Sequence, residues 1–169
     1  IPSIFASMTI HSKIGIDIGR VIIAGDTDQP NTFFSRDFLQ APAVQASIPA
    51  IARIALRHGP KNVFLVSKCG EATAERTLLW LHHQNFFVLT GIAPDQVFFC
   101  RERHEKQSIC ERLGIEVFID DRFTVLQHLL HLKQLYLFDP TEVELEKYTH
   151  VKRKLRNVKL VRSWKELEL

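Results

Sequence analysis

The sequence predicts a three-layer α/β fold, in which a mainly parallel sheet has helices on both faces. Short apolar runs alternate with longer helix-like segments, and this alternation is typical of parallel sheets flanked by helices. Polar side chains also follow several of the runs directly, where ligands gather in such folds. The length of 169 residues suits one compact domain. We expect that domain to span residues 13–169, after an N-terminal extension, residues 1–12.

The apolar runs and the segments between them give the expected order of elements. Six strands are expected at residues 14–18, 63–66, 97–100, 117–119, 135–138 and 158–161. Helices are expected at residues 43–58, 71–84, 105–113, 122–131, 142–155 and 164–169. Trp80 and Trp164 fall in two of these helices and are expected to pack them onto the sheet. In the extension, the residues before Met8 are interpreted as a tag remnant or a processed end.

The segment after the first strand breaks the alternation. Residues 21–23 and 32–34 are apolar, and residues 24–31 between them contain Gly, Asp, Pro and Asn. These residue types favour turns. The pattern predicts a small β-hairpin flap that projects over the strand ends.

Bulk composition excludes several classes of protein. The chain is 46% hydrophobic and 24% charged, and it has no apolar run of the roughly 18 residues that span a bilayer. A formal charge of +3 is too small to indicate a nucleic-acid partner. The three cysteines, Cys69, Cys100 and Cys110, form no CxxC pair, which favours reduced thiols over a disulfide framework or a zinc site. We therefore expect a cytoplasmic protein with no membrane partner.

Polar residues with chemical potential stand at the ends of four predicted strands. They are Asp17, Ser67, Lys106 after a short loop, and the pair Asp120 and Asp121. Each one alone has a simpler interpretation, as a turn or helix cap or as a solvated helix residue. Because the carboxyl ends of parallel strands border one crevice, their joint placement predicts a shared site.

These side chains suit a phosphoryl group and a magnesium ion. Asp17 can attack phosphorus to form an aspartyl-phosphate. Ser67 and nearby backbone N–H groups can hold phosphoryl oxygens, and Lys106 supplies a positive charge to those oxygens while restraining Asp17. Asp120 and Asp121 offer the hard oxygen ligands that Mg²⁺ prefers. The expected cofactor is therefore Mg²⁺, and the expected substrate is a phosphorylated compound.

The order of these residues resembles the haloacid dehalogenase (HAD) superfamily of phosphatases. The resemblance runs from about residue 13 to residue 130 through the segments IGIDIG, FLVSKCG, RERHEK and VFIDDR. It implies a Rossmann-like HAD fold and a hydrolase in which Asp17 is the nucleophile. It also implies metal ligation by Asp17, the Gly19 carbonyl and Asp121, support of the metal by Asp120, and phosphate binding by Ser67, Lys68 and Lys106.

The gaps between these segments leave no room for a large cap domain, so the chain resembles the capless members of the superfamily. An open site suits bulky substrates, or else depends on a partner subunit for cover, as in a homo-oligomer. Arg101, Arg103 and His104 stand just before Lys106. They either contact an anionic substrate at the rim of the crevice or form a solvated basic loop.

Gly19 is the departure from the family pattern. Phosphatases of the superfamily usually have an aspartate there, which protonates the leaving group and later activates water. General acid–base help is worth roughly 10²- to 10⁴-fold. Its loss predicts slow turnover, a substrate with a good leaving group, or a substitute acid, for which Asp26 and Asp28 are candidates. The alternative is a catalytically inactive module that binds phosphate and metal or serves in an interaction.

Three other readings rank lower. Relatives that cleave phosphonates also depart at this position, but they use a lysine from a cap. The dehalogenase branch is metal-independent and gives no reason for the pair Asp120 and Asp121. A receiver-type phosphoacceptor has its acidic pair early and its lysine late, whereas here the pair comes last.

Overall fold

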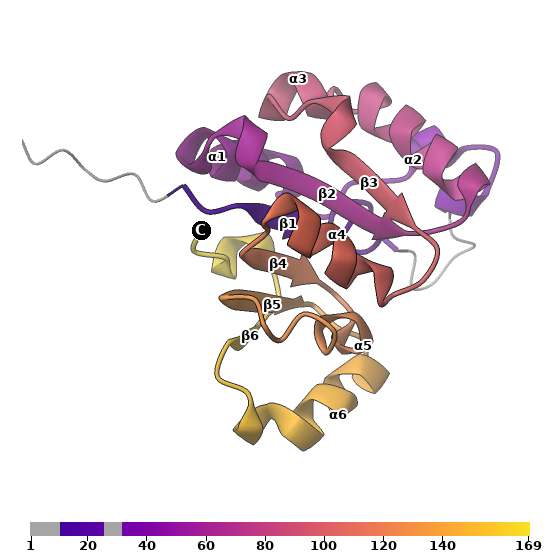
Figure 1. The fold of residues 1–169 in the computed structure, drawn as a ribbon. Helices are drawn as coiled ribbons and strands as arrows, with labels where there is room; N and C mark the ends of the chain where they lie inside the picture. The colour runs from indigo at the N-terminus through magenta and orange to yellow at the C-terminus, as the bar shows by residue number, and fades with distance from the viewer. Residues whose placement is uncertain (1–10, 26–31) are drawn as a thin grey trace, which may run out of the picture.

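A computed structural model of the chain describes residues 11–25 and 32–169. Its centre is a six-stranded sheet in the order β3-β2-β1-β4-β5-β6, with every neighbouring pair parallel (Figure 1). The strands are β1 (Ile14–Ile16), β2 (Val63–Lys68), β3 (Val97–Cys100), β4 (Val117–Asp120), β5 (Gln134–Phe138) and β6 (Val158–Val161). The predicted Rossmann-like α/β class is confirmed.

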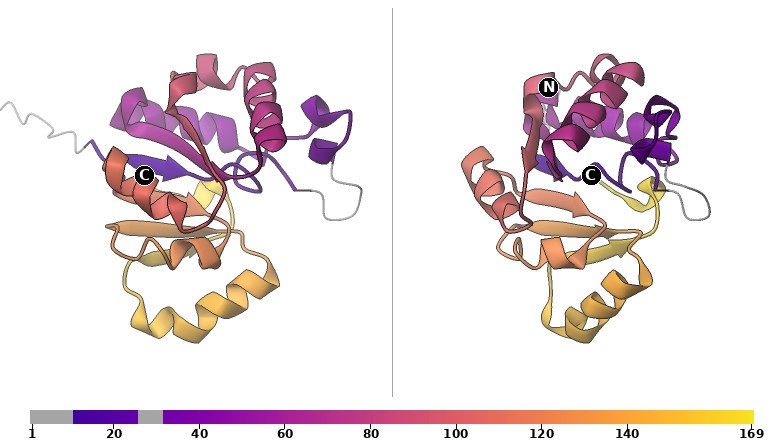
Figure 2. Two further views of the ribbon diagram at one scale, coloured as in Figure 1. Left: turned by 45° about the vertical axis from the view of Figure 1, so that its right-hand side comes forward. Right: turned by 90° about the vertical axis from the view of Figure 1, so that its right-hand side faces the viewer.

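Helices cover both faces of the sheet. They are α1 (Ser47–His58), α2 (Glu71–His83), α3 (Phe86–Thr90), α4 (Glu105–Leu113), α5 (Phe123–Leu126) and α6 (Glu142–Val151). One core layer joins the sheet to α1, α2 and α3, and the other joins it to α4, α5 and α6. Figure 2 shows α1 and α4 on opposite sides of the sheet. The result is three layers around two apolar cores.

In the middle of β1, the side chain of Phe118 from the neighbouring strand β4 packs directly against the backbone of Gly15. Gly15 pairs in register with Phe118 of β4. A Cβ atom on Gly15 would lie 2.5 Å from Cδ2 of Phe118, a distance that packed side chains do not tolerate. Glycine therefore lets the Phe118 ring lie across β1, where it helps to form the second core.

The predicted β-hairpin after β1 is wrong in its described parts. Residues Thr32–Phe34 form a 3₁₀ helix instead of a second strand. β1 ends at Ile16, and the Ile18 carbonyl then accepts hydrogen bonds from three amides, those of Val21, Ile22 and Ile23. This tight turn buries Val21–Ile23 in the first core. Ile23 forms its antiparallel bridge with Ala43, and residues 26–31 lie outside the described residues.

Several helices are shorter than their sequence patterns predicted. The helix expected from residue 43 begins at Ser47, because Ala46 adopts a left-handed conformation with φ 64°. The helix expected at residues 122–131 ends at Leu126, and the one expected from residue 164 is a 3₁₀ turn, Trp164–Glu166. Helix α6 ends at Val151 and continues as the 3₁₀ turn Lys152–Lys154. Helix α3 was not expected.

Both tryptophans pack onto the sheet, as predicted, and each also fixes the segment that follows β1. Trp80 of α2 donates its indole N–H to the Ala41 carbonyl at 2.8 Å. Trp164 donates to the Val21 carbonyl, also at 2.8 Å. Both side chains are buried. These two bonds hold the segment between β1 and α1 against the body of the domain.

None of the helices in the described residues is both long enough and apolar enough to cross a lipid bilayer.

Candidate functional site

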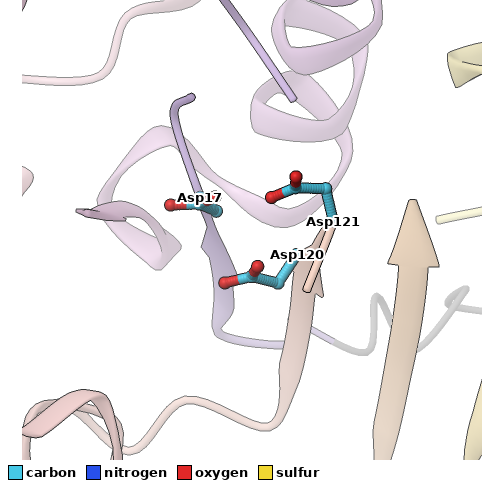
Figure 3. Close-up of side chains that lie close together, drawn as sticks. All are labelled: Asp17, Asp120 and Asp121. Atoms are coloured by element: carbon cyan, nitrogen blue, oxygen red, sulfur yellow. The ribbon is translucent and has the colours of Figure 1, made fainter. Parts of the chain in front are cut away.

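Three carboxylates meet where β1 and β4 end. Asp17 follows β1, Asp120 is the last residue of β4, and Asp121 comes next. All three side chains are buried, and one oxygen from each lies within 4.8 Å of the others. Figure 3 shows the three side chains at the adjoining ends of these two strands. β1 and β4 are neighbours in the sheet, so a chain separation of about a hundred residues becomes a direct contact.

Lys106 bridges two of these carboxylates. Its Nζ atom donates to Asp17 Oδ1 at 3.0 Å and to Asp120 Oδ2 at 2.8 Å. The lysine sits in the first turn of α4 and is almost completely buried. Burial alone lowers the pKa of this ammonium group, but the charges of Asp120 and Asp17 outweigh it and raise the pKa above its ordinary value. Lys106 therefore stays charged.

Asp120 and Asp121 have different surroundings. Both oxygens of Asp120 hold hydrogen bonds within the fold: Oδ2 accepts from Lys106, and Oδ1 accepts from the backbone N–H of Arg122 at 2.9 Å. Asp121 instead forms an ion pair in which Arg20 Nε lies 3.3 Å from Oδ2. Arg20 is half-exposed. Asp120 is thus held by hydrogen bonds on both oxygens, whereas Asp121 pairs with a side chain that is partly open to solvent.

The electrostatics of the cluster favour an added cation. Burial raises the pKa of Asp121, and the negative charges of Asp120 and Asp17 raise it further, against the smaller effects of Arg122 and Arg20. Burial and Asp17 also raise the pKa of Asp120, opposed by Lys106. Packing three carboxylates this closely is costly unless positive charge compensates them. A hard divalent ion with oxygen ligands fits the chemistry of this donor set.

A cleft of about 410 Å³ opens over the carboxylates, a volume in the range of small-molecule sites. Every residue assigned to the site from sequence lines it: Asp17, Gly19, Ser67, Lys68, Lys106, Asp120 and Asp121. The start of α2 also contributes Gly70 and Thr73, and this helix has no side-chain cap at its N-terminus. Free N–H groups at a helix start favour anions.

Of the basic residues expected at the rim, Arg103 lines the cleft. Arg101 and His104 are not among the lining residues, although Arg101 Nη1 lies 3.7 Å from the position of a Cβ atom built on Gly70. Asp26 and Asp28, the candidate substitute acids, lie outside the described residues.

Sequence reasoning missed Arg20. Its backbone is left-handed, with φ 62°, a conformation that is uncommon for a residue other than glycine and that often marks functional sites. The signal available in the sequence was its place between Gly19 and the buried Val21, directly beside the first motif. Its pairing with Asp121 depends on a tertiary contact that spacing along the chain does not reveal.

Cys69 and two phenylalanines were also missed. Cys69 lines the cleft, and burial raises the pKa of its thiol, with a further contribution from the Asp17 charge. A protonated thiol is a poor nucleophile, so Asp17 is the stronger candidate for attack. Phe33 and the exposed Phe34 also line the cleft, and Arg76 of α2 donates to the Phe33 and Ser35 carbonyls at 3.3 and 3.0 Å.

No protein-family model matches this chain, and a search of curated proteins finds no match. The functional argument therefore depends on the residues of the site itself.

Proposed function

We propose that the protein is a magnesium-dependent phosphohydrolase of the HAD type, which acts through an aspartyl-phosphate on Asp17. The observation that carries this proposal is the bridge from Lys106 to Asp17 and Asp120 beneath an open cleft. The buried lysine holds one oxygen of Asp17, and the other oxygen of that carboxylate is left for a ligand in the cleft. This arrangement suits nucleophilic attack.

The first half of the reaction uses Asp17. Lys106 contacts Oδ1, and no described residue forms a hydrogen bond with Oδ2. Oδ2 attacks phosphorus, and the bond from phosphorus to the leaving oxygen breaks. The leaving group departs with the bonding electrons and takes a proton from water. Lys106 keeps the attacking carboxylate oriented and attracts the phosphoryl oxygens.

The second half regenerates the carboxylate. Water attacks phosphorus, the bond between phosphorus and Asp17 breaks, and inorganic phosphate is released. Ser67 and Lys68 at the end of β2, with the start of α2, would hold the phosphoryl oxygens during both steps. Asp17, Asp121 and the Gly19 carbonyl would hold Mg²⁺, with Asp120 in support, and the bound ion supplies charge that lets two anions approach.

Gly19 favours a second candidate function, a binding module without turnover. Among the described residues, no carboxylate other than Asp17, Asp120 and Asp121 lines the cleft to replace the missing acid. The space for one exists, because a Cβ atom on Gly19 would meet nothing within 4 Å. A Gly19→Asp variant can therefore introduce an acid here without a steric conflict at its Cβ atom.

We also propose that the protein is cytoplasmic, where thiols stay reduced. Cys69, Cys100 and Cys110 are all free thiols, as is usual for cytosolic proteins. Cover of the open cleft by a second copy of the chain, in a homo-oligomer, is likewise proposed.

The test is hydrolysis of an activated aryl phosphate with and without Mg²⁺. Wild type is compared with Asp17→Asn, Gly19→Asp and the control Asp139→Asn, a carboxylate at the end of a different strand. We expect magnesium-dependent release that Asp17→Asn abolishes and Asp139→Asn preserves. Gly19→Asp should increase turnover of a substrate with a poor leaving group by about 10²-fold or more.

Two other outcomes have clear meanings. No release by wild type, together with activity in Gly19→Asp, assigns the binding module, because the pocket is then intact and only the acid is missing. Release that survives Asp17→Asn refutes the aspartyl-phosphate route.

A further inference from the structure

The mouth of the cleft carries three basic side chains besides those of the inner cluster. Lys68 ends β2, Arg103 precedes α4, and Arg122 follows Asp121. All three line the cleft. Lys68 and Arg122 are exposed, and Arg103 is half-buried. They come from three separate segments of the chain, so their convergence is a product of the fold and not of a basic run in the sequence.

These rim cations form no ion pair in the described part of the chain, although the charge of Arg122 acts on Asp121 from beyond ion-pair distance and opposes the rise of its pKa. None of the ion pairs formed there involves Lys68, Arg103 or Arg122. Arg20 and Lys106, which line the same cleft, are both paired with buried carboxylates. The rim is therefore a positive surface left open toward whatever enters the cleft.

Both arginines are anchored to the inner cluster through their backbones. The Arg103 carbonyl accepts from the Lys106 N–H at 3.2 Å, and the Arg122 N–H donates to Asp120 Oδ1 at 2.9 Å. Lys106 and Asp120 are in turn bonded to each other. The backbones of the two arginines are therefore tied to Lys106 and Asp120, the residues bonded to one another beside Asp17.

One phosphoryl group does not need all of this charge. With the cluster ionised, the three carboxylates and a phosphoryl dianion are nearly balanced by Mg²⁺, Lys106 and Arg20. One rim cation makes up the difference, and Lys68, beside Ser67, already has that role in the proposed phosphate site. Arg103 and Arg122 are not needed for this balance.

We propose that Arg103 and Arg122 form a second anion subsite, so that the substrate is a small molecule with a second phosphate group beyond the one that reacts. This inference rests on the proposed function, since it describes the substrate of the same cleft. A volume of about 410 Å³ accommodates a compound of this size. Guanidinium groups suit phosphate because their paired N–H donors match its oxygens.

The experiment measures binding of non-hydrolysable probes, without any need for turnover. Propylphosphonate carries one phosphonate, and the corresponding propylene diphosphonate carries one at each end. Their dissociation constants are measured by calorimetry at one fixed concentration of free Mg²⁺, for wild type, for the double variant Arg103→Gln/Arg122→Gln, and for Arg162→Gln. Arg162 is a matched control, because it is a half-exposed arginine at the end of another strand.

Wild type should bind the diphosphonate about tenfold more tightly than propylphosphonate, as expected for two charge contacts at a rim that is open to solvent. That ratio should fall close to one in the double variant and stay near tenfold in Arg162→Gln. Adding salt should reduce the ratio, since exposed charge contacts are screened.

Equal affinity of wild type for the two probes overturns the second subsite, and so does a tenfold ratio that survives in the double variant. In both cases tight binding of propylphosphonate leaves the proposed function standing. If neither probe binds, the phosphate pocket itself is refuted, and both proposals fall together.

Discussion

Charged side chains occupy the strand ends in two regions of this sheet, with opposite consequences. At the ends of β1 and β4, Lys106 bonds to Asp17 and Asp120 at 3.0 and 2.8 Å, and the three side chains are 2%, 11% and 0% exposed. At the ends of β5 and β6, Arg162 lies 3.6 Å from Asp139, and these side chains are 50% and 58% exposed. Both sets of charges lie at the carboxyl ends of neighbouring parallel strands, but the first set is buried and the second is exposed.

The comparison shows which charges need a functional explanation. An exposed ion pair costs little to form and contributes little to stability. A buried charge loses its hydration, and the mutual attraction of the pair only partly compensates that loss. Stability alone does not explain why three carboxylates and a lysine are buried at the ends of the central strands β1 and β4. The buried cluster, and not every polar strand end, is therefore the candidate site.

The largest effect is expected from Lys106→Met, which removes the only described cation that bonds to both Asp17 and Asp120. The two carboxylates then remain buried without it. We expect the free energy of unfolding to fall by about 3–5 kcal/mol, as measured by denaturant titration in the absence of metal.

A second substitution checks the cause. Adding Asp120→Asn to Lys106→Met removes one of the stranded charges, so the double variant should lose less than the sum of the two single losses. A loss below about 1 kcal/mol for Lys106→Met would mean that the buried cluster behaves like the exposed pair.

Mg²⁺ should stabilise the folded protein by binding at the Asp17–Asp120–Asp121 cluster, and not at the exposed pair of Asp139 and Arg162. A ligand present at 100 times its dissociation constant adds about 2.7 kcal/mol to the stability of the folded state. We expect a rise in the midpoint of thermal unfolding with added Mg²⁺. Asp121→Asn should reduce that rise and Asp139→Asn should leave it unchanged. Equal responses of the two variants would argue against a metal at the cluster.

Cys69 reports on the charge inside the cleft. Because burial and the Asp17 charge raise the pKa of its thiol, less thiolate is present at any pH below that pKa than in an ordinary cysteine. Alkylation by iodoacetamide should therefore be slow at neutral pH and accelerate only in alkaline solution. Cys100 and Cys110 are buried, so mass spectrometry should find the label on Cys69.

The Asp17→Asn variant isolates the electrostatic part of this effect. Removing the negative charge lowers the pKa of the Cys69 thiol, so alkylation should be a few-fold faster than in wild type at the same pH. Unchanged rates would mean that Asp17 does not act on the thiol at the end of β2.

The smallest effect is expected in the second region. Asp139→Asn or Arg162→Gln should change the free energy of unfolding by about 0.2–1 kcal/mol, and added salt should reduce even this difference. A larger loss would show that the exposed pair contributes more than its solvent contact suggests.

Strand positions were predictable because apolar runs in a buried parallel sheet are local signals. Val97–Cys100 and Val158–Val161 match their expected bounds. The convergence of Asp17, Ser67, Lys106 and Asp121 was also predictable, because parallel strand ends share one edge. The strand order was not predicted, but any parallel sheet built from these strands brings their carboxyl ends to the same side.

The segment after β1 was not predictable, because its conformation is set by distant residues. Val21–Ile23 is an apolar, β-branched run like a strand, yet the Ile18 carbonyl and the Trp164 indole hold it in a buried turn. The pairing of Arg20 with Asp121 follows from the same turn. Tertiary contacts of this kind override local propensity, and they cannot be predicted from the spacing of residues along the chain.

The hydrogen bond from Trp164 to Val21 has a consequence for how the molecule is made. During synthesis Asp17 emerges early, whereas Trp164, which fixes the loop beside it, emerges more than a hundred residues later. A domain generally folds as a unit. The loop beside Asp17 can therefore acquire its hydrogen bond from Trp164 only after nearly the whole domain has been synthesised.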